Sequence, residues 1–322
     1  MAGTGKSTQH GSNSLPFWLM SRLYAARVTI LWVMTFLMLT GFILKGVVEE
    51  FCEQCELEDK LARKSVPTSP QQEAVRAVSN SSASCLTVDF AKEGSQELVA
   101  LASYPGSGNT WLRHLVEHST GIYTGSVYTD KKLLSGGFHG EERDFMERSV
   151  LGVKMHRCSK RELKKFDAVV FLVRNPYNAM VSEWHRYHSS QHTGTVDLDT
   201  FKSKEWEEFV EEESIHWEKM MRNCLKNNGR RLVVFYENLQ TNLLIELARL
   251  MEFFKKPVNI DRLRCTIENA EGKFHRSNSL DFDPFTPEMV VAVNQRIQSA
   301  AATLKSLVDL EFPEDYKRPV KS

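Results

Sequence analysis

The 322-residue chain lacks an excess of charge of either sign, because its 41 basic side chains are matched by 41 acidic ones. This balance excludes a general electrostatic attraction to nucleic acid, so any anion-binding site must be local. No internal repeat is visible in the sequence. With 42% hydrophobic residues the chain can bury a full core, and its length indicates one sizeable catalytic domain with accessory segments.

The residues of a magnesium-nucleotide site are also missing. After residue 97, no Gly-Lys-Ser/Thr phosphate loop occurs, and no acidic residue follows a predicted strand where it would bind magnesium. Residues 1–8 imitate the end of such a loop, but no strand leads into them. A kinase or NTPase is therefore the disfavoured alternative, although the expected fold class also hosts phosphoryl transfer.

Charged residues are absent from residues 28–44, a stretch of 17 residues, at the lower end of the ~17–25 that cross a bilayer. Arg22 and Arg27 precede this stretch and glutamates follow it, which indicates a cytoplasmic N-terminus. We therefore expect a cytoplasmic tail at 1–27, a signal anchor at 28–44, a lumenal stem at 45–97 and a catalytic domain at 98–322. A cleavable signal peptide is the alternative, but no clean small-x-small site follows.

All six cysteines follow the predicted membrane span. A lumenal location makes disulfides the expectation, but their pairing cannot be deduced from the sequence. Cys52 and Cys55 form a single CxxC next to the membrane. For this pair a stem disulfide, within one chain or between the chains of a homodimer, is favoured over redox chemistry. Asn80 begins an Asn-Ser-Ser glycosylation sequon, which is consistent with the lumen.

Short apolar runs alternate with helical patterns from residue 98 onward. Buried strands are predicted at 98–102, 149–155, 168–173 and 231–236, and helices are predicted at 110–119, 176–188, 204–226, 243–254 and 287–307. This alternation favours an α/β fold whose central parallel sheet is covered by helices on both faces. We expect a P-loop-like three-layer sandwich, preceded by a single N-terminal transmembrane helix.

The segment between the first strand and the first helix has the composition of an anion-binding turn. Gly106 and Gly108 free the backbone to curl, and the unpaired N–H groups of the next helix can point at an anion. Ser107, Asn109 and Thr110 add side-chain donors. A plain strand-to-helix turn is the alternative interpretation.

A second group of residues follows the strand at 168–173. Arg174 comes at the carboxyl end of this strand, where parallel sheets bind ligands, and a guanidinium suits phosphate oxygens. Ser182 lies eight residues later, about two helical turns, and can donate to the same phosphate. A surface salt bridge is the alternative for Arg174.

These two segments resemble the donor-binding signatures of the sulfotransferase superfamily. Residues 104–111 are similar to the loop that binds the 5′-phosphosulfate of 3′-phosphoadenosine 5′-phosphosulfate (PAPS), and residues 169–182 are similar to the motif for its 3′-phosphate. The resemblance covers residues 98–312 and implies PAPS as the donor substrate.

The same resemblance implies further donor-binding residues. Tyr236, at the end of a strand, would help enclose the adenine, to which Trp111 and Phe274 could add stacking. Core packing is the alternative for Trp111. Lys273 and Arg276 belong to a variant of the basic loop that closes over the 3′-phosphate.

Within the superfamily, the sequence Ser-Tyr-Pro-Gly-Ser-Gly-Asn-Thr-Trp at 103–111 resembles that of the WSC-domain-containing sulfotransferases, which act on sialic acid. This chain lacks their Cys-rich WSC modules. The resemblance implies a single-pass type II Golgi membrane enzyme that sulfates a glycan hydroxyl, with sialic acid as the first candidate. It implies no metal requirement, and the pair His188 and His192 shows no clear third ligand for zinc.

Lys154 and His156 are the candidate catalytic residues. They end a predicted strand and lie two positions apart, so both side chains can share one face. A histidine suits proton abstraction near neutral pH. The resemblance makes His156 the base and Lys154 the partner of the sulfuryl or bridging oxygen.

One position departs from the family pattern. Many sulfotransferases carry a lysine where this chain has Gly106. Lys154 is the first candidate to supply the missing cation, followed by Arg113 and Lys273. A lumenal module that binds nucleotide without catalysing transfer is the alternative that this departure leaves open.

Overall fold

The computed structural model describes residues 87–188, 198–226, 229–272 and 280–320. The expected membrane span at 28–44, the stem cysteines and Asn80 lie outside these ranges. Within them, no helix combines the length and the apolar character needed to cross a membrane.

Five parallel strands form the central sheet in the order β2-β3-β1-β4-β5. In chain order they are β1 (Val99–Ser103), β2 (Gly125–Ser126), β3 (Val153–Met155), β4 (Ala168–Val173) and β5 (Arg230–Phe235). All four pairings are parallel. The carboxyl ends of these strands therefore meet at one edge, which is the edge that binds ligands in open sheets of this kind.

Each strand of the sheet's centre is buried on both faces, because alternate residues join two different clusters. Ala100 and Ala102 of β1 belong to one core cluster, whereas Val99 and Leu101 belong to the other. The strands β4 and β5 divide their side chains in the same way. The period of two that a strand imposes on its side chains thus produces two cores on opposite sides of one sheet.

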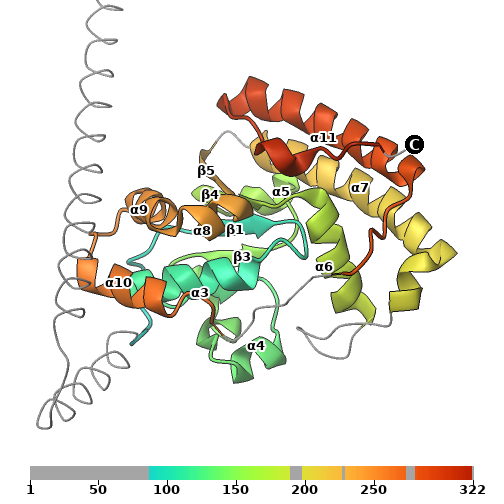
Figure 1. Ribbon diagram of the computed structural model, residues 1–322. Coiled ribbons are helices and arrows are strands. Elements are labelled where there is room, and N and C mark those ends of the chain that lie inside the picture. Colours follow the sequence, from blue (N-terminus) through green and yellow to red (C-terminus); the bar gives the residue numbers. More distant parts are fainter. Residues whose placement is uncertain (1–86, 189–197, 227–228, 273–279, 321–322) are drawn as a thin grey trace, which may run out of the picture. The chain divides into compact units, whose positions relative to one another are not determined.

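Helices cover both faces, as Figure 1 shows. The first cluster takes in α6 (Pro176–His188), α7 (Lys204–Leu225) and α11 (Pro287–Val308). The second takes in α3 (Asn109–Thr120), α9 (Leu243–Phe253) and α10 (Ile260–Glu268). The predicted α/β arrangement with a central parallel sheet between two helical layers is confirmed.

Shorter elements complete the described residues, and the sequence did not predict them. They are α4 (Lys131–Ser135), α5 (Lys160–Leu163), α8 (Tyr236–Thr241), η2 (His139–Glu141), η3 (Phe145–Glu147), η4 (Leu198–Lys202) and η5 (Glu314–Tyr316). The third strand is shorter than its apolar run, because the run's first residues bond to segments outside the sheet. The carbonyl of Ser149 accepts from Ala91 N at 2.9 Å, and Leu151 N donates to Tyr123 O at 2.9 Å.

A disulfide joins Cys158, just after β3, to Cys224 in α7, with their Cα atoms 5.0 Å apart. The expectation of disulfides is therefore confirmed for this pair. Because 66 positions separate the two cysteines, only the fold could bring them together. The bond fixes the segment that follows β3 to α7, in the helical layer on one face of the sheet.

Candidate functional site

Two glycines shape the loop that follows β1. Gly106 has φ 74° and Gly108 has φ 89°, a region that side chains disfavour. A Cβ at Gly106 would lie 2.4 Å from the carbonyl oxygen of Ala179 in α6, and a Cβ at Gly108 would lie 2.6 Å from the ring of Tyr236. Glycine is therefore needed at both positions, because the loop backbone is pressed between α6 and Tyr236.

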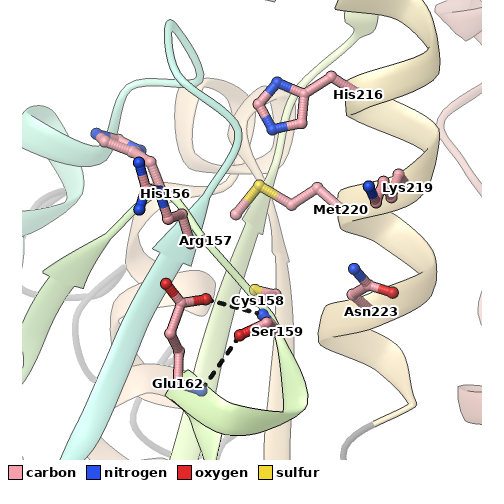
Figure 2. A pocket seen from close by; sticks show the side chains of 9 residues that line it. All are labelled: His156, Arg157, Cys158, Ser159, Glu162, His216, Lys219, Met220 and Asn223. Atoms are coloured by element: carbon pink, nitrogen blue, oxygen red, sulfur yellow. Dashed lines mark hydrogen bonds between the residues drawn. The ribbon is translucent and has the colours of Figure 1, made fainter.

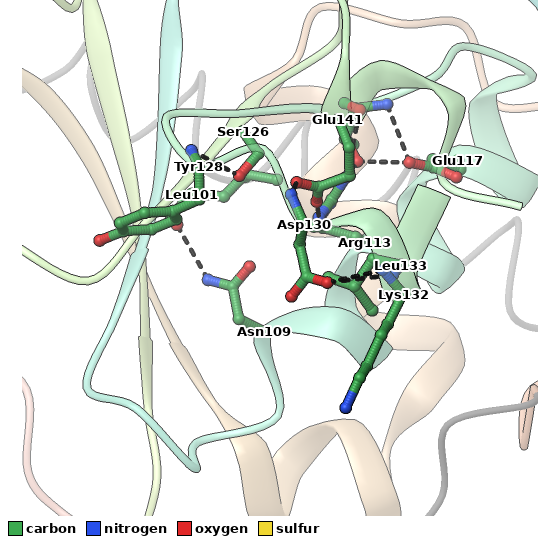
Figure 3. A network of polar contacts seen from close by, with 11 residues as sticks. Leu101, Asn109, Arg113, Glu117, Ser126, Tyr128, Asp130, Lys132, Leu133 and Glu141 are labelled. Carbon is green, nitrogen blue, oxygen red and sulfur yellow. Dashed lines mark hydrogen bonds and ion pairs between the residues drawn. The ribbon is translucent and has the colours of Figure 1, made fainter. Parts of the chain in front are cut away.

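The polar side chains of the loop divide into two roles. Asn109 Nδ2 donates to Leu101 O at 2.9 Å and to Ser103 Oγ at 3.1 Å (Figure 3 shows the first of these). Its amide group thus holds the loop's shape. The hydroxyl of Ser107 is buried and forms no hydrogen bond within the described residues, so this donor remains for a ligand. Thr110 is half-buried at the start of α3.

Arg174 reaches the loop from the end of β4. Its Nη1 donates to the carbonyl of Gly106 at 2.9 Å, and its guanidinium lies 4.2 Å from the ring centroid of Tyr236. Burial lowers the pKa of Arg174, but a guanidinium stays charged. Its buried Nε has no hydrogen-bond partner among the described residues. The structure therefore brings the two predicted halves of the donor site together around a half-buried cation.

Aromatic rings continue this cluster. Tyr236 is the first residue of α8, directly after β5, and its ring packs edge-on against Trp111 with centroids 5.2 Å apart. The indole nitrogen of Trp111 donates to Ala270 O at 2.7 Å, which fixes the ring's orientation. Two predicted adenine-binding residues thus lie beside Gly108 and Arg174.

Of the remaining predicted donor-binding residues, the structure describes only Ser182 and Thr110. Ser182 is half-buried on α6, next to Glu183. A Cβ added at Gly106 would lie 3.3 Å from the Cβ of Glu183. The helix face that carries Ser182 therefore borders the loop. Lys273, Phe274 and Arg276 lie outside the described residues.

His156 follows β3 directly and approaches the same loop. Its Nδ1 lies 2.9 Å from the carbonyl oxygen of Ser103. A carbonyl can only accept, so this nitrogen carries the proton and Nε2 presents a lone pair. Burial, with a smaller contribution from the charge of Lys154, lowers the pKa of His156 to about 3. The neutral ring is therefore in the protonation state of a base.

Tyr128 supports this histidine, although no motif in the sequence indicated it. Its hydroxyl accepts from the backbone N–H of His156 at 3.0 Å, and the two rings stack with centroids 5.7 Å apart. The tyrosine thus restrains both the backbone and the ring plane of the candidate base.

Lys154 is buried within β3, one strand away from the loop, since it pairs with Leu101 of β1. Burial is the main cause that lowers the pKa of Lys154 to about 8, and the charge of Arg113 adds to it. Glu141 opposes the shift. The amine is consequently a cation at neutral pH. Its buried, low-dielectric environment strengthens its electrostatic interaction with nearby charges.

Arg113, the second candidate for the missing cation, has a different role. It is fully buried and forms an ion pair with Glu141 (Figure 3). It also donates from Nε to Thr124 Oγ1 at 2.7 Å. Its charge is therefore neutralised where it lies. Of the two candidates that the structure describes, Lys154 is the buried cation that forms no ion pair within the described residues, and Lys273 lies outside them.

A cavity of about 210 Å³ opens beside His156. Figure 2 shows it between the segment after β3 and helix α7. Its lining residues are His156, Arg157, Cys158, Ser159, Glu162, His216, Lys219, Met220 and Asn223. Apart from His156, none of them was predicted as a site residue, because those on α7 are distant in sequence from every motif.

The described ranges hold no group of three or more His, Cys, Asp or Glu side chains placed to bind a metal ion. Of the histidines considered for zinc, His188 instead packs its ring on Trp184 at 3.9 Å between centroids. His192 lies outside the described residues.

Comparison with known proteins adds independent observations. The sequence profile of the sulfotransferase domain matches residues 96–295. WSCD family member CG9164 of Drosophila melanogaster is 39% identical over 214 residues, which cover 65% of this chain and 67% of the fly protein. WSCD family member AAEL009094 of Aedes aegypti is 37% identical over the same shares of the two chains. A crystal structure of mouse sulfotransferase SULT7A1 complexed with PAP is 16% identical, with a TM-score of 0.43, and the alignment covers 64% of this chain and 83% of the mouse protein.

Proposed function

This chain belongs to the sulfotransferase domain family, and from that premise we propose that it transfers a sulfuryl group from PAPS to a hydroxyl of a glycan. The predicted enzyme class, a sulfotransferase of the WSC-related branch, is confirmed by the family match and by relatives at 39% identity. The observation that carries the proposal is the convergence of Arg174, the loop at Gly106 and the ring of Tyr236.

The residues at this convergence fit a doubly phosphorylated adenosine. The buried Ser107 hydroxyl and the buried Nε of Arg174 have no hydrogen-bond partner within the described residues, and a phosphate oxygen would satisfy either group. The N-terminus of α3 adds backbone N–H groups at the same place. Trp111 and Tyr236 supply aromatic surface for the adenine.

The reaction needs one proton acceptor and one cation. The acceptor hydroxyl oxygen attacks sulfur, its proton passes to Nε2 of His156, and the bond from sulfur to the phosphate oxygen breaks, which releases adenosine 3′,5′-bisphosphate (PAP). Lys154 would stabilise the negative charge that develops on the bridging oxygen. The anionic donor also favours a protonated imidazole, so donor binding would raise the pKa of His156 toward a useful value.

The cellular setting is part of the same proposal. The uncharged stretch at 28–44 with its flanking charges supports a type II anchor in the Golgi membrane, with the catalytic domain in the lumen. Residues 45–97 would form the stem, where Cys52 and Cys55 could link two chains. Sialic acid is the first acceptor to test, given the branch of the family to which the chain is similar.

A transfer assay tests the proposal. The full chain is incubated with sulfur-labelled PAPS and sialylated or desialylated glycoproteins, and label on a glycan is the expected result. His156→Ala should reduce transfer by about 100-fold or more, as expected when a general base is lost, while PAP affinity stays near that of the wild type. Full activity in this variant would remove His156 as the base.

Nucleotide binding separates the competing functions. PAP should raise the melting temperature of the protein, whereas magnesium-ATP should not; the reverse result would favour a kinase or NTPase. Binding of PAP without label on any acceptor would favour a non-catalytic module. This alternative is motivated by glycine, rather than lysine, at position 106.

A further inference from the structure

The cavity beside His156 has two walls that come from distant parts of the chain. Residues 156–159 and Glu162 form one wall, and His216, Lys219, Met220 and Asn223 of α7 form the other (Figure 2). The disulfide between Cys158 and Cys224 joins the two walls, with Cα atoms 5.0 Å apart. The cavity is therefore held at a fixed width next to the candidate base.

Its two walls each contribute one cation. Arg157 and Lys219 are exposed and line the cavity, and within the described ranges neither side chain forms an ion pair or a hydrogen bond. The lining holds two of these cations against one carboxylate, Glu162, which accepts from Ser159 N at 3.1 Å in a capping box. The cavity thus carries local positive charge in a chain whose net charge is zero.

We propose, building on the sulfotransferase function above, that this cavity is the acceptor subsite and that Arg157 and Lys219 bind the carboxylate of an acidic sugar. The cavity's volume of about 210 Å³ leaves room for several water molecules, a space suited to one sugar ring. A guanidinium and an ammonium that line the same cavity can each give a charge-assisted hydrogen bond to a carboxylate.

This arrangement selects acceptors by charge and orients the reacting hydroxyl. A sugar fixed by its carboxylate at Arg157 and Lys219 would extend toward His156, whose Nδ1 lies 2.9 Å from the carbonyl oxygen of Ser103, the last residue before the donor loop. Asn223 supplies an amide at the far wall for hydroxyl groups. A neutral sugar of the same shape would lose the contact to both cations.

Two acceptors that differ only in charge test the proposal. One is a sialylated oligosaccharide, and the other is the same compound with its carboxylate converted to a primary amide, so that every hydroxyl is kept. With labelled PAPS, the wild-type full chain should favour the acid by about 10-fold in kcat/KM, the effect of one charge-assisted hydrogen bond. The double variant Arg157→Gln, Lys219→Gln should lose this preference through a higher KM for the acid. Lys160→Gln, an exposed neighbour that does not line the cavity, is the matched control and should keep the preference.

The outcomes separate the two proposals. Equal rates with acid and amide in the wild type, or an unchanged preference in the double variant, would overturn the carboxylate subsite while sulfuryl transfer itself remains established. No label on either compound, with PAP still bound, would instead overturn the proposed function and this subsite with it. Retention of the preference in Arg157→Lys would support recognition by charge.

Discussion

Replacing Arg174 with methionine should separate donor binding from stability. The change removes a hydrogen bond to Gly106 O at 2.9 Å and a cation–π contact at 4.2 Å, together worth about 2–3 kcal/mol. It also removes a half-buried charge that has no ion-pair partner within the described residues, and the desolvation of this charge opposes those contacts. These effects oppose each other, so we expect the free energy of unfolding to change by no more than about 1–2 kcal/mol.

Donor affinity should respond very differently. Losing one member of a buried charge pair costs about 2–5 kcal/mol, so PAP binding should weaken by about 30-fold to several thousand-fold. Calorimetric titration with PAP measures this change, and urea unfolding measures stability. Arg231→Met is the matched control, because Arg231 also donates to a backbone carbonyl but pairs with Val169 at the opposite end of the sheet. If Arg174→Met bound PAP as tightly as the control, the placement of the donor phosphate at Arg174 would be refuted.

Three further substitutions test other parts of the structure. Gly108→Ala would place a Cβ 2.6 Å from the ring of Tyr236, so urea unfolding should show a loss of about 1–3 kcal/mol, with weaker PAP binding. Burial raises the pKa of Glu117 from 4.5 to about 7, so between these pH values the folded state binds more protons than the unfolded state. The free energy of unfolding should therefore fall by about 3 kcal/mol as the pH rises from below 4.5 to 7. Glu117→Gln should remove that decline from the melting temperature measured against pH. Cys158→Ala should cost about 4 kcal/mol in the chain-entropy account of a long closed loop, measured by unfolding without reductant, and an unchanged stability would contradict it.

The sequence was most informative where a segment carries its own signal. The bounds of β4 and α6 agree with the predictions at both ends. An uninterrupted apolar run marks the strand, and Pro176 marks the first helical residue, where a missing N–H costs nothing. By contrast, β2 consists of two residues that pair only with β3, and nothing in so short a stretch distinguishes it from a loop.

The site shows the same division between local and distant contacts. The donor loop and Arg174 could be predicted, because each lies at a strand end that the apolar pattern identified. Tyr128 and Lys219 could not, since they reach His156 or its cavity only after distant segments pack together. Asn109 was predicted as a ligand donor, whereas its amide hydrogens bind Leu101 O and Ser103 Oγ. Composition identifies a donor but cannot show which partner it takes.

The glycine at position 106 is consistent with catalysis when the whole site is considered. A side chain there is blocked by the Ala179 carbonyl, which a Cβ would approach to 2.4 Å, so this loop conformation cannot carry a lysine. The carbonyl of Gly106 is instead bound by the guanidinium of Arg174 at 2.9 Å. A second cation, Lys154, is buried on the strand next to β1. Positive charge therefore reaches the loop through Arg174, and a second cation, Lys154, lies one strand away, so neither comes from the loop's own side chains. Both groups are held by packing, which is the preorganisation that charge stabilisation requires.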